Sequence, residues 1–180
     1  YTLWHTLSLH DALPISLTGL PLWLGLEGEV IATRNDKLPL ALMMIGLDGY
    51  SPLLTEHNEE QANLLVAQSA RRIAQSLPVT ARLHRYLCSR FIVLLPEADQ
   101  KRALEVAEQI RAALEAETVE IGSSPVSLAV SIGISALAAD EADPTIAINR
   151  AATALTTAFN RGGNQVVWLA ARESWLEQKT

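Results

Sequence analysis

The chain has 180 residues, of which 49% are apolar, and it carries a formal net charge of −6. This length and apolar content suit one domain with a sizeable core and exclude a disordered chain. The acidic balance argues against broad binding to nucleic acid or anionic membranes, which requires an excess of Lys and Arg. The single cysteine, Cys88, excludes an intrachain disulfide and a cysteine-rich metal site, and it favours a reducing cytoplasm. Apolar stretches such as 17–26 are too short to cross a bilayer, so no membrane segment is expected.

The first residues stand apart from the rest of the chain. Residues 6–15, TLSLHDALPI, resemble one reading frame of a common sequencing adaptor. Residues 1–16 are therefore expected to be an artefact of assembly, with a genuine linker as the alternative. On this interpretation the domain occupies residues 17–169, and residues 170–180 form a connector helix or tail.

The remaining pattern alternates between helical and strand periodicity. Apolar residues at helical spacing, with caps and breakers at their ends, predict helices at 23–35, 59–77, 99–117 and 143–160. Apolar or alternating runs predict strands at 40–45, 80–87, 91–95, 126–135 and 165–169. Runs 80–87 and 91–95 are expected to pair as a hairpin. This order predicts an α/β (α+β) fold in which helices flank a mixed central sheet.

The turn of that hairpin determines the functional interpretation. Residues 87–91 read LCSRF, with neither a carboxylate nor a glycine. Cys88 could be a reactive thiol beside Arg85 and Arg90, or simply a small residue in a turn. Together with Arg82 and His84, these arginines could form an anion site, or be solvated charges on the rim of the sheet.

Five segments resemble, in order, the motifs of the GGDEF (diguanylate cyclase) family. They are LTGLP at 17–21, the strand at 40–50, the hairpin at 85–96, VSIGIS at 130–135 and the segment 151–166. The resemblance implies a nucleotidyl-cyclase, palm-like fold. Active members condense two GTP molecules into cyclic di-GMP across a dimer, using two divalent metals held by carboxylates.

The chain departs from the family pattern at the metal positions. The first metal-binding aspartate falls on Gly46, and the next position, Leu47, offers only a backbone carbonyl. The second strand-end aspartate is retained as Asp48. The third and fourth letters of the GGDEF motif fall on Ser89 and Arg90.

The nucleotide-binding positions implied by the resemblance are also substituted. The motif's two glycines, which let backbone approach phosphate, fall on Leu87 and Cys88. The guanine-contacting pair falls on Leu54 and Asn63, and the phosphate-contacting lysine falls on Phe159. The product-inhibition motif RxxD is absent at 78–81, which reads PVTA.

These substitutions predict a catalytically inactive, cytoplasmic GGDEF domain that regulates or contacts other parts of a cyclic-di-GMP signalling protein. Expected partners are other domains of the same chain, such as a sensor or an EAL phosphodiesterase domain, and a homodimer is an alternative. No metal or cofactor is expected. The alternatives are residual diguanylate cyclase activity, which would require Mg²⁺, and GTP binding without turnover.

Overall fold

A computed structural model describes residues 18, 20, 26–33, 39–50, 55, 58–87, 89–121, 124–138, 141 and 143–171. The described helices are α2 (Leu26–Thr33), α4 (Glu59–Ser76), α5 (Gln100–Glu115) and α6 (Pro144–Asn160). The described strands are β1 (Leu40–Leu47), β2 (Arg82–Leu87), β3 (Arg90–Pro96), β4 (Thr118–Ile121), β5 (Ser124–Ser127), β6 (Val130–Leu137) and β7 (Val166–Leu169). None of the helices among these residues is long and apolar enough to span a membrane.

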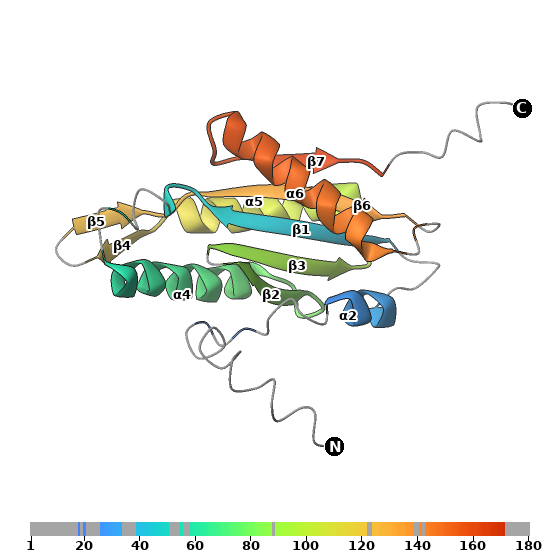
Figure 1. The fold of residues 1–180 in the computed structure, drawn as a ribbon, viewed down its shortest axis with the longest axis horizontal. Coiled ribbons are helices and arrows are strands. Elements are labelled where there is room, and N and C mark those ends of the chain that lie inside the picture. The colour runs from blue at the N-terminus through green and yellow to red at the C-terminus, as the bar shows by residue number, and fades with distance from the viewer. Residues whose placement is uncertain are drawn as a thin grey trace, which may run out of the picture.

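The molecule is built on a sheet of five strands in the order β2-β3-β1-β6-β7 (Figure 1). β1 lies in the middle and pairs antiparallel with both β3 and β6, while β6 and β7 run parallel. β1 is buried at every position from Leu40 to Leu47, as a central strand covered on both faces must be. The prediction of a mixed sheet flanked by helices is confirmed.

Two apolar layers lie on opposite faces of this sheet, because side chains alternate along each strand. Residues Ala41, Met43 and Ile45 of β1 join the cluster formed with α4 and α5. Residues Leu42 and Met44 join the cluster formed with α2 and α6. Figure 1 shows α6 crossing in front of the sheet and α5 lying behind it.

The helices begin where short polar side chains cap them. Asn58 accepts a hydrogen bond from the backbone N–H of Gln61, and Asp99 accepts one from Arg102. Asp143 does the same for Thr145, with Pro144 at the first turn of α6. Asp99 therefore caps the helix predicted at 99–117.

The region 116–137 differs from the prediction of one strand at 126–135. That segment is divided into β5 and β6, and β5 pairs with β4, a strand that the sequence analysis did not predict. Around the break, Leu128 is buried and its N–H bonds the carbonyl of Glu117 instead of a strand neighbour, at 3.4 Å. Alternation of apolar residues continued across the break, so the sequence pattern did not reveal it.

Several predictions fall outside the described residues. They include the adaptor-like segment 1–16 and the tail from residue 172 onward. The first two residues of the predicted connector helix, Ala170 and Ala171, are described and are not helical. The predicted helix 23–35 is described only from Leu26 to Thr33.

α6 lies against β6 at a point where the strand has no side chain. A Cβ built on Gly133 would lie 2.2 Å from the carbonyl oxygen of Ala151 and 2.2 Å from the backbone nitrogen of Leu155. Since no real Cβ tolerates such distances from backbone atoms, glycine is what allows α6 to approach so closely. This contact fixes the height of α6 above the sheet.

Candidate functional site

The positions aligned with the family's metal ligands lie together at one edge of the sheet, where β1 ends and its neighbours β3 and β6 begin. Gly46 lies opposite Arg90 of β3 on one side and Ser131 of β6 on the other. The backbone N–H of Leu47 donates to the carbonyl of Ser89 at 3.1 Å. The fold therefore brings Gly46 and Leu47 together with Ser89 and Arg90, although more than 40 residues of sequence separate the two pairs.

The ring of Phe159 lies over Gly46. A Cβ built on Gly46 would be 2.6 Å from the Cζ atom of Phe159 and 3.3 Å from a methyl carbon of Leu155. Any side chain at position 46 would therefore begin inside space that α6 already fills. The two substitutions, glycine in place of the carboxylate at 46 and phenylalanine in place of the lysine at 159, are thus in direct contact.

Asp48 follows β1, and both of its carboxylate oxygens are bonded. The hydroxyl of Ser131 donates to Oδ1 at 2.8 Å, and the backbone N–H of Asn164 donates to Oδ2 at 2.7 Å. Gly163 packs against the same carboxylate, since a Cβ there would lie 3.1 Å from Oδ2. Asp48 therefore holds the loop between α6 and β7 against the end of β1.

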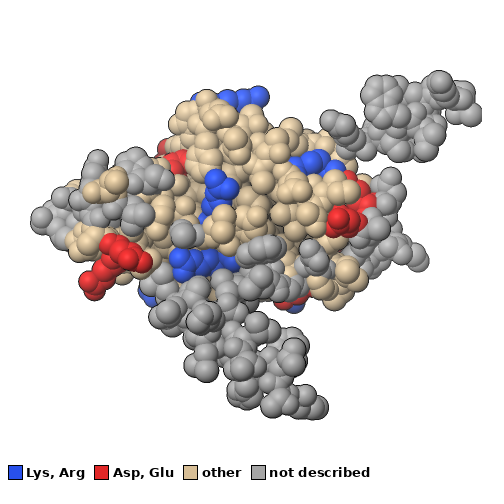
Figure 2. Space-filling view, viewed as in Figure 1, with Lys and Arg blue, Asp and Glu red and all other residues tan. Residues whose placement is uncertain are grey.

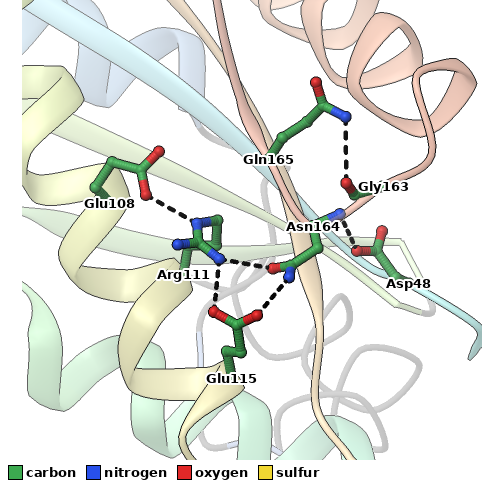
Figure 3. A network of polar contacts seen from close by, with 7 residues as sticks. All are labelled: Asp48, Glu108, Arg111, Glu115, Gly163, Asn164 and Gln165. Carbon is green, nitrogen blue, oxygen red and sulfur yellow. Dashed lines mark hydrogen bonds and ion pairs between the residues drawn. The ribbon is translucent and has the colours of Figure 1, made fainter.

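Asn164 continues this network to α5 (Figure 3). Its side-chain amide donates to Glu115 at 2.7 Å and accepts from Arg111 at 3.0 Å. Arg111 also donates to Glu115 and to Glu108, at 2.8 Å each. Asn164 has a positive φ of 49°, a conformation that asparagine tolerates better than most residues.

The same contacts shift the pKa values of two members of the network. The amide of Asn164, followed by the guanidinium of Arg111, lowers the pKa of the Glu115 carboxyl. Hydrogen bonds to Glu108 and then Glu115 raise the pKa of Arg111. Both shifts favour the charged forms of Glu115 and Arg111, as expected for a directly bonded ion pair.

The four basic residues weighed as an anion site differ in burial and in bonding partners. His84 is buried and bonded to Glu29 of α2, and Arg85 is 8% exposed. Arg82 donates to the carbonyls of Thr80 and Ala81. Neither a shared anion site nor a set of solvated charges fits His84 and Arg85.

Arg90 differs from its basic neighbours. It is half-exposed, and within the described part of the chain no side chain or carbonyl bonds its guanidinium. In Figure 2, Lys and Arg side chains lie scattered over the middle of the viewed face, with acidic groups toward both ends.

The remaining nucleotide positions lie elsewhere or outside the description. Asn63 lies on α4 and lines a surface hollow together with its neighbours Asn58, Glu59, Glu60, Gln61, Leu64 and Ala67. Leu87, at the end of β2, is 53% exposed. Leu54 and Cys88 are outside the described residues.

The family's two divalent cations do not fit the residues present here. Mg²⁺ takes several oxygen ligands, and carboxylates supply the charge that holds it. Among the described residues no three His, Cys, Asp or Glu side chains gather as a metal site would require. Asp48 is committed to the α6–β7 loop, and Gly46 faces an aromatic ring.

Comparison with known proteins agrees with the fold and the motif order. Residues 16–165 match the family described as "Diguanylate cyclase, GGDEF domain". The match spans most of the chain, which therefore belongs to the GGDEF family.

The individual relatives share only a modest part of their sequence with this chain. The response regulator PleD of Caulobacter vibrioides is 27% identical over 135 residues, covering 74% of this chain and 30% of PleD. The GGDEF domain of YfiN (TpbB) from Pseudomonas aeruginosa superposes with a TM-score of 0.80 at 22% identity, covering 86% of this chain and 99% of that one. Diguanylate cyclase SiaD of Pseudomonas aeruginosa, solved in complex with its activator SiaC, gives a TM-score of 0.79 at 22% identity, covering 85% and 60%. The chain spans about a third of the length of the curated relatives it matches.

Gly46 and Phe159 stand out in the sequence separately, but their contact does not. The partners around Asp48, which are Ser131, Asn164, Glu115 and Arg111, were not predicted either. The spacing of Glu108, Arg111 and Glu115 at three and four residues along a helix was the available signal for part of this network.

Proposed function

We propose that this chain is a GGDEF domain that has lost cyclase chemistry and acts as a regulatory or interaction module in cyclic-di-GMP signalling. The observation that carries the proposal is the ring of Phe159 over Gly46, where a metal-binding carboxylate would have to begin. The remaining acid at the strand ends, Asp48, has both oxygens bonded to protein groups. A domain with this site retains its surfaces but lacks the means to clamp a metal-bound triphosphate.

The proposed setting is a longer cytoplasmic protein. The curated relatives are about three times as long as the matched region, which supports additional domains on either side. SiaD was solved with an activator bound, which supports the idea that a GGDEF domain of this fold can be a docking partner. A sensor domain, an EAL phosphodiesterase domain or a second copy of this chain is the proposed contact.

A direct assay tests the loss of activity. Purified protein is incubated with GTP and Mg²⁺ or Mn²⁺, and cyclic di-GMP is measured by mass spectrometry against a heat-killed sample. An active member of the family serves as the positive control. Product above the heat-killed level would overturn the proposal, and its absence alongside a working positive control supports it.

One observation favours a second function, GTP binding without turnover. The guanidinium of Arg90 lies at the strand ends without a bonded partner among the described residues, and arginine is well suited to phosphate contacts. Titration calorimetry with GTP decides between the two. Arg90→Glu should abolish the heat of binding if the arginine contacts phosphate, whereas Arg102→Glu on the exposed surface of α5 should leave it unchanged. No heat at high micromolar GTP would reject this second function.

A further inference from the structure

A contact between α2 and the edge strand β2 is not explained by the vestigial nucleotide site. The Nε2 atom of His84 lies 2.6 Å from a carboxylate oxygen of Glu29, although the two residues are 55 positions apart. Because a carboxylate accepts hydrogen bonds, Nε2 carries the proton and donates it. This bond joins α2 to the strand that leads into the hairpin turn.

The burial of the two partners is unequal. The His84 side chain is 4% exposed, whereas that of Glu29 is 45% exposed. The other ring nitrogen, Nδ1, is buried without a hydrogen-bond partner among the described residues. Glu29 thus satisfies a ring that would otherwise be buried with neither nitrogen bonded, which is costly.

The apolar attachments of α2 are few among the described residues. Its buried apolar side chains are Leu26 and Val30, which pack in the cluster shared with α6 and with Ile92 and Leu94 of β3. His84 lies directly opposite Ile92 in the β2–β3 pairing. If α2 moved away, the imidazole and this apolar patch would be uncovered together.

The strand that His84 belongs to is the part of the sheet best placed to respond. β2 is an edge strand, so among the described residues only β3 holds it by strand pairing. Its register with β3 shifts between Arg85 and Leu87, immediately after His84. An irregularity of this kind interrupts the ladder and leaves the end of the strand less firmly paired.

We infer that the Glu29–His84 contact couples the position of α2 to the order of the β2–β3 hairpin. Docked α2 holds β2 in register, and with it the turn that carries Ser89 and Arg90. Displaced α2 releases the end of β2 and loosens that turn. The inference rests on the proposed regulatory function for its purpose, but the coupling itself is a property of the fold.

Hydrogen exchange of backbone amides in the full chain tests this coupling. Glu29→Ala should speed exchange at residues 82–87 and 90–92 by about tenfold, because a buried donor loses its acceptor. Ile31→Ala is the matched control, since Ile31 lies on the same helix and is 65% exposed. It should leave hairpin exchange within about twofold of the parent protein.

The second arm replaces the ring itself. In a His84→Leu background no buried donor remains, so Glu29→Ala should have no further effect on the hairpin. The inference is overturned if Glu29→Ala matches Ile31→Ala, or if its effect persists without His84. Should His84→Leu fail to fold, Glu29→Gln in the parent background decides: its amide oxygen can still accept from Nε2, so exchange should match that of Ile31→Ala, and exchange as fast as in Glu29→Ala would overturn the inference. Cyclase activity in the assay above would overturn the proposed function and leave this exchange result standing.

Discussion

The contact between Gly46 and Phe159 allows a quantitative test of whether the ring fills the space at position 46. In Gly46→Ala the new Cβ would lie 2.6 Å from Cζ of Phe159, about 1 Å inside normal van der Waals contact. The ring is the end of a rotatable side chain, so it can yield, but only by repacking against its neighbours. Overpacking of this kind costs about 1–3 kcal/mol.

A smaller term opposes this cost. Replacing glycine inside a strand reduces the entropy of the unfolded chain and recovers about 0.5–1 kcal/mol. The net expectation for Gly46→Ala is a loss of about 1–2 kcal/mol. For a chain of this length, that lowers Tm by about 2–8 °C.

The double variant isolates the contact. Phe159→Ala alone should cost about 2 kcal/mol, below the value for a fully buried ring because Phe159 is half-buried. In that background the overpacking cost is removed and only the gain of about 0.5–1 kcal/mol remains, so the two changes should couple by about 1–3 kcal/mol. Urea denaturation followed by circular dichroism measures each variant.

A matched glycine provides the control. Gly28 on α2 is exposed, and a Cβ built on it would have no atom within 4 Å, so Gly28→Ala should stabilise by about 0.5–1 kcal/mol. The reasoning is refuted if Gly46→Ala costs as much without the ring as with it. In that case the ring would not fill the space at position 46.

Three further outcomes are expected from the polar contacts. Asp48→Ala should lower the free energy of unfolding by about 2–3 kcal/mol in urea titrations, because it orphans a buried serine hydroxyl and a loop amide; a loss below about 0.5 kcal/mol would contradict its structural role. Glu115→Gln should be less stable than the parent at neutral pH. Since folding lowers the pKa of Glu115 below its ordinary value of 4.5, that difference should vanish as pH falls through the folded pKa, and a pH-independent difference would argue against the charge. Glu141 forms an ion pair with Arg150 in which both side chains are largely buried, so Glu141→Ala should cost about 3 kcal/mol. Glu105 pairs with Arg102 on the exposed surface of α5, so Glu105→Ala should cost less than about 1 kcal/mol; equal losses would refute the role of burial.

The order of elements could be predicted because apolar periodicity and breakers agree along most of the chain. Asp99, Pro144 and the glycines at 162–163 mark the ends of helices through local chemistry, which a sequence displays directly. The unbroken run at 91–95 indicated a buried strand for the same reason. These features depend on residues close together in the chain.

The candidate site could be predicted only as a set of positions. The substitutions at 46, 89, 90 and 159 are visible in the sequence, but the packing of Phe159 on Gly46 depends on how α6 crosses β1. The pairing of β4 with β5 and the bond between Glu29 and His84 depend in the same way on how separate elements meet. No periodicity encodes such contacts, because their partners lie on different elements.

The absence of a side chain at Gly133 also determines how close α6 lies to Gly46. Because backbone atoms of α6 pack directly on β6 there, the helix cannot move closer to the sheet. The ring of Phe159, one helical turn beyond Leu155, is held above Gly46 by this packing. A smaller side chain at position 159 would therefore open space beside Gly46 without any movement of the backbone.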